Sequence, residues 1–247
     1  MVYCSSGRKV FYLWGRRFRK GVTMEITIPE LLELVRPGET VVVEYETSYV
    51  PEFALKLLAD YTRENNVPFV IDDNFDSLYT VLVHCDMLGL EVDIDHAYVF
   101  KTGGKKEVGG TIKRVEFHPD PRVLVRNYDV AFADTVGTSK NPAINLILGI
   151  ENLLYFVRDV RDFYRFLLGL QRYVGDKRRK AFYLIHIGLI RSLPPYVHPE
   201  LRRIATSVWV FHSYPTGVKL SILRSPDLDL VGREFTIDVG GVFRGRS

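Results

Sequence analysis

The stretch of the chain that comes nearest to a phosphate-binding loop is rich in glycine and lysine. It reads GGKK at 103–106 and is followed by Gly109 and Gly110. Glycines let backbone N–H groups converge on phosphate oxygens, but such a loop also needs a hydroxyl after its lysine and a helix that begins there. No hydroxyl follows the lysines, and the flanking segments, HAYVFK and TIKRVEF, are typical of extended chain. We therefore predict an exposed hairpin turn rather than a phosphate site.

The histidines and cysteines form no recognisable ligand or nucleophile pattern. Cys4 and Cys85 are too few and too far apart for a disulfide framework or a metal site, which favours a reducing cytoplasm. No nucleophile elbow or Ser-His-Asp arrangement is recognisable. The sequence thus predicts no metal, no cofactor and no catalytic residue. We expect all six histidines to be structural, because none has HxH, HExxH or CxxH spacing: His84, His96, His118, His186, His198 and His212.

The positive charge of the chain is concentrated at its start. The formal net charge is +3, but residues 1–23 carry six basic residues and no acidic one. In the remainder, 27 basic residues face 30 acidic ones. A slightly acidic body is a poor electrostatic match for nucleic acid, so we expect nucleic-acid binding only through the basic tail. The run KRRK at 177–180 is predicted to be a solvated loop, with an acidic partner or RNA as the alternative.

Residues 1–23 allow three interpretations. Their apolar cluster VFYLW is too short for a signal-peptide core, and more basic residues follow it. The segment is a disordered extension or misassigned start with Met24 as the true first residue, an extra β-strand, or a basic-aromatic patch for a membrane surface or nucleic acid. No apolar run approaches the roughly 18 residues needed to cross a membrane, so no span is predicted. We expect residues 24–247 to form a single domain.

The apolar pattern alternates between strand and helix over most of the chain. This order predicts a parallel sheet with right-handed crossovers, and the last third then predicts strands alone. Asp76 or Ser77 is the expected cap of the third helix, and Phe163 and Phe166 either belong to the core or mark an oligomer surface. The expected helices are 28–35, 52–66, 77–89, 121–136 and 159–174, and the expected strands are 40–44, 67–71, 144–148, 181–187, 206–213, 218–223 and 234–240.

This order resembles the RecA/KaiC branch of the P-loop ATPases over roughly residues 26–242. IPELLELVRPGETVVVEYET resembles that group's short helix, Pro-Gly turn and first strand, and FALKLLADYTRENN its next helix. TSVWVFHSYPTGVKLSILRS with REFTIDVGGV resembles the terminal strands. More narrowly, the chain is similar to an uncharacterised family from hyperthermophilic Thermococcales archaea. The broader resemblance implies a fold and a position for a nucleotide, and the narrower one implies a fold and a source but supplies no activity.

The residues at the implied nucleotide loop depart from the G-x-x-x-x-G-K-[ST] pattern. The matching stretch is 44–51, and Thr47 and Tyr49 stand where glycines are needed, with Ser48 between them. Val50 replaces the lysine that neutralises phosphate, and Pro51 replaces the hydroxyl that holds Mg²⁺. Glu44 and Glu46 also place negative charge where a polyphosphate would lie. We therefore predict that the loop is degenerate.

The other implied catalytic positions are equally incomplete. Gly149 stands where the resemblance implies a metal-binding Asp after the strand 144–148. Asp72 and Asp73 directly follow the strand 67–71, where that group of ATPases keeps glutamates that activate water. They are the candidate pocket carboxylates. Without the lysine, the hydroxyl and the glycines, several kcal/mol of transition-state stabilisation are missing, on the order of what such electrostatic groups supply.

The sequence thus predicts an α/β fold, a RecA-like three-layer sandwich with a mostly parallel sheet flanked by helices and a C-terminal antiparallel β-meander. The predicted function is a non-catalytic interaction or regulatory module that binds a protein partner or itself. One alternative is a nucleotide- or nucleic-acid-binding protein with an altered pocket around 47–49 and Asp72-Asp73. Another is a hydrolase or transferase with an unrelated site.

Overall fold

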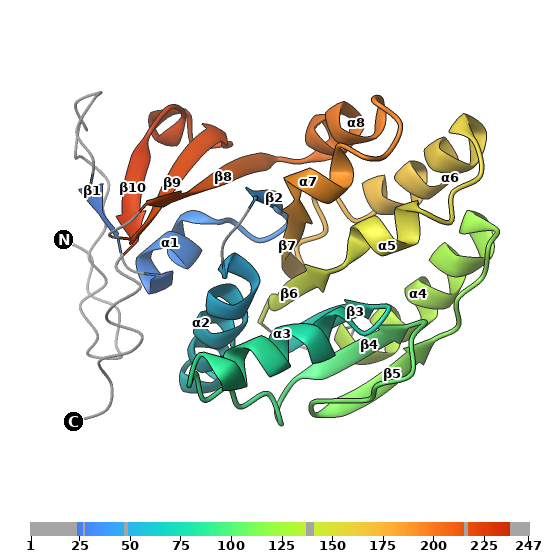
Figure 1. Ribbon diagram of the computed structural model, residues 1–247, viewed down its shortest axis with the longest axis horizontal. Helices are drawn as coiled ribbons and strands as arrows, with labels where there is room; N and C mark the ends of the chain where they lie inside the picture. Colours follow the sequence, from blue (N-terminus) through green and yellow to red (C-terminus); the bar gives the residue numbers. More distant parts are fainter. Residues whose placement is uncertain (1–23, 27, 47–48, 137–140, 215–216, 238–247) are drawn as a thin grey trace.

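The computed structural model describes residues 24–26, 28–46, 49–136, 141–214 and 217–237 (Figure 1). Strands and helices alternate along most of this chain, as the apolar pattern predicts. The strands are β1 (Met24–Glu25), β2 (Thr40–Tyr45), β3 (Phe69–Asn74), β4 (Tyr98–Thr102), β5 (Thr111–Val115), β6 (Ala143–Leu148), β7 (Arg179–His186), β8 (Ser207–Tyr214), β9 (Gly217–Arg224) and β10 (Glu234–Ile237). The helices are α1 (Ile28–Leu34), α2 (Val50–Glu64), α3 (Ser77–Met87), α4 (Pro121–Val136), α5 (Ile150–Leu154), α6 (Val160–Gln171), α7 (Ile187–Ile190), α8 (Val197–Ile204) and the short 3₁₀ helix η1 (Leu228–Leu230).

All of these strands belong to one twisted sheet with the order β1-β10-β9-β8-β2-β7-β6-β3-β4-β5. The strands from β8 through β5 pair in parallel, whereas β8, β9 and β10 pair antiparallel. The predicted mostly parallel sheet with a C-terminal antiparallel meander is confirmed. The two-residue strand β1 pairs in parallel with β10 and was not predicted.

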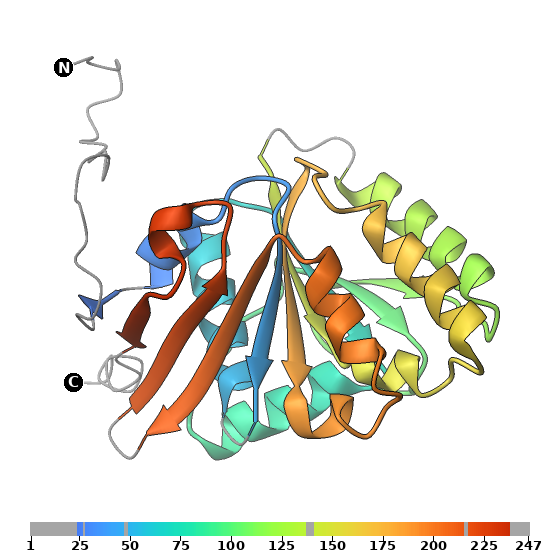
Figure 2. The same cartoon turned by 90° about the horizontal axis from the view of Figure 1, so that it is seen from above.

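Helices cover both faces of the sheet, which gives three layers (Figure 2). One apolar core lies under α1, α2 and α3, and a second lies under α4 to α8. Central strands of this kind are buried on both faces, which explains the continuous apolar runs of β2 and β6. Along β2, Val41 and Val43 pack into the first core while Val42 packs into the second, as strand geometry requires. Phe163 and Phe166 are buried in the second core.

No helix in the described ranges is both long enough and apolar enough to cross a bilayer.

The glycine-rich stretch after β4 differs from the prediction, because β4 and β5 are parallel rather than a hairpin. The carboxylate of Asp76 fixes the connection between them. It accepts hydrogen bonds from the backbone N–H groups of Lys105 and Lys106 at 2.9 and 2.8 Å and from Lys101 Nζ at 2.5 Å. These contacts hold the pKa of Asp76 at about 2, although burial alone would raise it. A Cβ on Gly104 would lie 2.3 Å from the Asp76 carboxylate, so glycine is required there.

Asp76 was one of the two residues expected to cap α3, but its side chain makes no hydrogen bond to the start of that helix. It takes the left-handed conformation with φ 64° and is turned toward Lys101 instead. Asp73 performs the capping role from the end of β3, where its Oδ1 accepts the N–H of Leu78 at 2.9 Å. The sequence predicts a capping residue directly before the helix, whereas in the folded protein the capping carboxylate comes from Asp73 in strand β3.

The basic run 177–180 was predicted to be solvated, and this is wrong at Arg179. Arg179 is the first residue of β7 and is only 1% exposed. Its Nη1 donates to Asn145 Oδ1 at 2.6 Å, and its guanidinium lies 4.6 Å from the centre of the Tyr173 ring. Asn145 in turn donates to Asp72 at 3.2 Å. A buried cation and a buried carboxylate are thus joined through one amide.

Replacing Arg179 with Met should be strongly destabilising, because Asp72 would keep its buried carboxylate without a nearby cation. We expect a loss of about 3 kcal/mol or more in the free energy of unfolding, measured by urea denaturation. Arg178→Met is the matched control, because the adjacent side chain is 49% exposed and its ion pair with Asp176 should contribute about 1 kcal/mol or less. Equal losses in the two variants would contradict this account of Arg179.

Candidate functional site

A large hollow lined by described residues lies at the carboxyl edge of the parallel strands. It has a volume of about 640 Å³ and is bounded by the ends of β2, β6 and β7 and by the first turns of α2, α3 and α5. Open α/β sheets bind ligands at this edge. We call it the acidic hollow and define it by its lining residues: Tyr45, Glu46, Tyr49, Pro51, Glu52, Phe75, Ser77, Thr80, Val81, His84, Leu148, Gly149, Glu151, Asn152, Leu184, His186 and Leu189.

The predicted loop positions fall into three places. Thr47 and Ser48 lie outside the described residues. Tyr49, 51% exposed, and Pro51, buried, both line the acidic hollow. Val50 is buried and lines a separate apolar cavity.

The first turn of α2 offers little to an anion. Pro51 has no backbone N–H, and Tyr49, the residue before the helix, makes no side-chain capping bond. The next residue, Glu52, brings a carboxylate to the positive end of the helix dipole, where an anion is stabilised. The positive end of the α2 dipole is therefore already next to a carboxylate of the chain itself.

Glu52 is the least expected residue of the hollow, because the sequence gives no motif that includes it. Its side chain is buried, and its Oε1 lies 2.7 Å from His84 Nδ1 on α3. Its Oε2 is buried with no hydrogen-bond partner among the described residues. Buried carboxylate oxygens are costly when unpaired, so Glu52 Oε2 lacks a hydrogen-bond donor that would stabilise it.

Glu151 brings a second buried carboxyl group to the same hollow. It follows β6 by three residues, and its Oε1 accepts the N–H of His186 at 2.5 Å. Burial raises the pKa of Glu151 to about 7, and the backbone hydrogen bonds offset only part of that rise. The hydroxyl of Tyr45 feels both acids, because burial and the charges of Glu151 and Glu52 raise the pKa of Tyr45. The charges of both carboxyl groups therefore influence the same part of the hollow.

Glu44 and Glu46, which were expected to place charge beside a polyphosphate, have different surroundings. Glu44 points to the opposite face of β2, where it pairs with Arg202 and with His198 at 2.8 Å. Its charge is therefore neutralised away from the hollow, and the expectation fails for Glu44. Glu46 does line the hollow, but it is largely exposed and pairs with Arg191 at 2.9 Å.

Asp72 and Asp73 point to opposite faces of the sheet, and neither lines the acidic hollow. Asp72 accepts a hydrogen bond from the Tyr128 hydroxyl at 2.9 Å, under α4, and burial raises its pKa to about 6. Asp73 accepts from Lys101 Nζ at 2.7 Å in addition to capping α3. The structure does not bring these two carboxylates together with the loop after β2.

Gly149 occupies a position that has no room for a side chain. Its φ is +69°, and a Cβ would lie 2.0 Å from Ser77 Oγ and 2.7 Å from the backbone oxygen of Asn74. A metal-binding Asp cannot be placed there without moving β3. Elsewhere in the described part of the chain, no group of three or more His, Cys, Asp or Glu residues is arranged to hold a metal ion.

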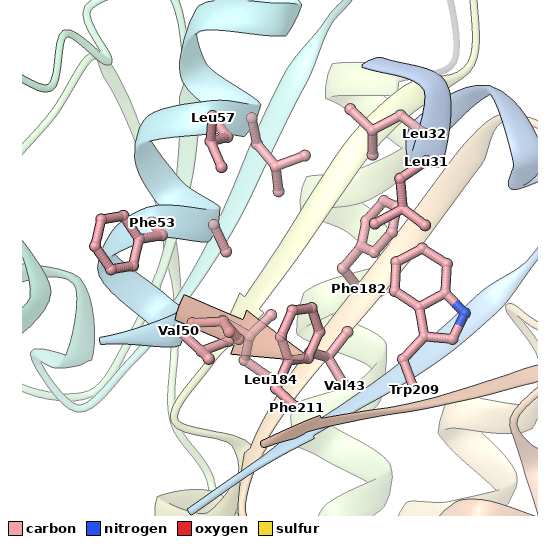
Figure 3. Close-up of a pocket in the computed structure, with 13 residues that line it drawn as sticks. Leu31, Leu32, Val43, Val50, Phe53, Leu57, Phe182, Leu184, Trp209 and Phe211 are labelled. Atoms are coloured by element: carbon pink, nitrogen blue, oxygen red, sulfur yellow. The ribbon is translucent and has the colours of Figure 1, made fainter. Parts of the chain in front are cut away.

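An apolar cavity lies next to the acidic hollow, and Leu184 lines both. Its volume is about 70 Å³, and side chains from α1, α2 and the strands converge on it (Figure 3). Leu31 and Leu32 approach from α1, and Phe182 of β7 and Trp209 of β8 lie beside them. Only apolar surface lines it. The cavity suits a single apolar group and offers no chemistry.

Comparison with known protein families identifies the family to which the chain belongs. The family described as "Pyrococcus protein of unknown function, DUF257" matches residues 30–236. The chain belongs to this family. A search of curated proteins found no significant match.

Solved structures share the fold of this DUF257 protein. The PH0250 protein of Pyrococcus horikoshii OT3 is 23% identical, with a TM-score of 0.71 over 84% of this chain and 97% of that one. The KaiC-like protein PH0186 of the same organism is 15% identical, with a TM-score of 0.56 over 87% and 93%. The uncharacterised PH0321, solved in complex with an unknown peptide, is 13% identical, with a TM-score of 0.57 over 76% and 85%. At these identities the likeness is one of fold, which is RecA/KaiC-like.

Gly149 allows a matched test in this DUF257 protein, because Gly89 has the same φ of +69° with no atom within 4 Å of an added Cβ. Ala at either position incurs the backbone cost of a left-handed conformation, about 1 kcal/mol. We expect Gly149→Ala to lose about 1–3 kcal/mol more than Gly89→Ala in urea denaturation, because only the first creates a collision. Equal losses would show that space at Gly149 is not restricted.

Glu151 predicts a pH-dependent stability. Its pKa is raised from 4.5 to about 7, so the folded protein binds more protons than the unfolded chain between those values. Stability contributed by this group is therefore lost as the pH rises through that window. Glu151→Gln should be more stable than the natural protein at pH 8 by about 1–3 kcal/mol, and the difference should shrink toward pH 4.5. Thermal unfolding across that range measures it, and a pH-independent difference would contradict the assignment.

Proposed function

We propose that this protein binds another polypeptide and does not hydrolyse ATP. The composition of the acidic hollow supports this proposal, because the hollow lies at the edge of the sheet where the resemblance to RecA/KaiC proteins implies a nucleotide. Three glutamates and two histidines line it, and none of its described lining residues is Lys or Arg. A triphosphate needs converging N–H donors and a cation, so this lining opposes it.

Several positions support the proposed loss of nucleotide chemistry. Val50 turns into an apolar cavity, Pro51 lacks an N–H, and Gly149 leaves no space for a metal-binding carboxylate. Each change removes a different part of the phosphoryl-transfer machinery: the lysine, the loop donor and the Mg²⁺ ligand. A degenerate nucleotide site is the simplest account of all three.

Two observations favour a polypeptide as the ligand. The PH0321 protein, which has the same fold, was solved in complex with an unknown peptide. Around the acidic hollow, Tyr49, Phe156 and Leu189 are 44–51% exposed and provide apolar contact area. Exposed aromatic and aliphatic side chains of this kind are enriched at protein interfaces. A second copy of the chain and a different protein are both included in this class of partner.

Isothermal titration of the full-length protein with ATP and Mg²⁺ tests the first half of the proposal. We expect no binding heat at micromolar protein and millimolar nucleotide, and no increase in the thermal unfolding temperature, because the hollow offers carboxylates to an anion. An active P-loop ATPase in the same buffer is the positive control. A micromolar dissociation constant would overturn the proposal and favour the nucleotide-binding alternative.

A further inference from the structure

Resting on the proposed function, we propose that the acidic hollow binds a basic side chain of the partner polypeptide. The guanidinium of an arginine or the ammonium of a lysine would enter the hollow and donate to the Glu52 carboxylate, with Glu151 as the second acidic group beside it. This assigns the chemistry that the site recognises, whereas the proposed function assigns only the class of partner.

The unpaired oxygen of Glu52 is the strongest argument for a cationic donor. His84 Nδ1 contacts Oε1, while Oε2 is buried without a partner in the described chain. An arginine carries five N–H donors and a lysine three, and hydrogen bonds to a charged acceptor are the stronger kind. A basic side chain therefore supplies what this oxygen lacks and compensates its buried charge.

No Lys or Arg of the chain competes for the hollow among its described lining residues. Glu46 already has Arg191, and Glu44 on the other face has Arg202 and His198. Glu151, in contrast, has only backbone N–H groups as donors in the described part of the chain. The buried carboxylate of Glu44 is thus matched with cations of the chain, whereas those of Glu52 and Glu151 are matched, among the described residues, with a histidine and with backbone.

The size of the hollow and the aromatic part of its wall also suit a basic side chain. The volume of about 640 Å³ falls in the range of ligand sites, which is about 300–1,000 Å³, and it accommodates a long side chain with its neighbouring backbone. Tyr45, Tyr49 and Phe75 form part of the lining. Aromatic walls suit the methylene stem of Lys or Arg and attract its cationic head.

Other ligands fit less well. Phosphate and nucleotides would meet Glu52 and Glu151 without any Lys or Arg in the described lining. A metal ion has no group of three ligating side chains in the described ranges. A purely apolar side chain would leave Glu52 Oε2 unpaired and would fit the cavity beside Val50 better.

The test begins with selection of random dodecapeptides on the full-length protein. We expect the selected peptides to share at least one Arg or Lys. Binding of a selected peptide, followed by fluorescence anisotropy, should weaken tenfold or more when that Arg is replaced by its neutral isostere citrulline, or that Lys by norleucine. This arm needs no protein variant, so it holds even if a substitution disturbs folding.

Glu52→Gln is the matching change on the protein. It preserves shape and should weaken the same peptide about tenfold or more, with little further loss for the citrulline or norleucine version, because both changes remove one interaction. Glu64→Gln is the control, since Glu64 lies exposed in the last turn of the same helix. Its affinity should stay within twofold of the natural protein.

These experiments distinguish failure of the basic-side-chain proposal from failure of the proposed polypeptide-binding function. Selected peptides without basic residues, or an affinity unaffected by Glu52→Gln, would overturn the basic-group assignment while a polypeptide-binding function stands. A selection that enriches no peptide would overturn both.

Discussion

Consecutive residues of a buried strand must point to opposite faces of the sheet, and this constraint decides which side chains can act together. At the end of β2, Glu44 is directed toward Arg202 and Tyr45 toward the acidic hollow. At the end of β3, Asp72 contacts Tyr128 under α4, and Asp73 caps α3. Pairs that are adjacent in the sequence are therefore separated by the thickness of the sheet. The groups that share the hollow come from different elements instead.

The buried carboxylates differ in how their charge is supported. Burial alone would raise the pKa of Glu44, but the hydrogen bonds from Arg202 and His198 hold it below its ordinary value. For Glu151, burial outweighs the backbone donors and the pKa rises. The first arrangement is self-contained and structural. The burial of Glu151 leaves an electrostatic cost for its ionised form in the folded protein. Ionisable groups with perturbed pKa values are concentrated at functional sites.

The fold could be predicted from the sequence much further than the site. Long apolar runs and helical spacing located the central strands and the main helices, because burial on both faces leaves a strong pattern. The parallel pairing of β4 and β5 was missed, since the pattern of two short strands around glycines does not distinguish a crossover from a hairpin. Arg179 was missed because a basic run carries no sign of which member a strand will bury. Glu52 and Glu151 belong to no motif, and only the tertiary structure brings them to one hollow.

The contact between Asp76 and the GGKK connection has a consequence for the chemistry of that loop. Two backbone N–H groups and the Lys101 ammonium converge on one carboxylate, which is the arrangement that anion-binding loops use for phosphate or sulfate. Because Asp76 is covalently tethered, its effective concentration far exceeds that of any free oxyanion in solution. The backbone donors of this loop are therefore occupied by an internal ligand, and they serve architecture rather than recognition.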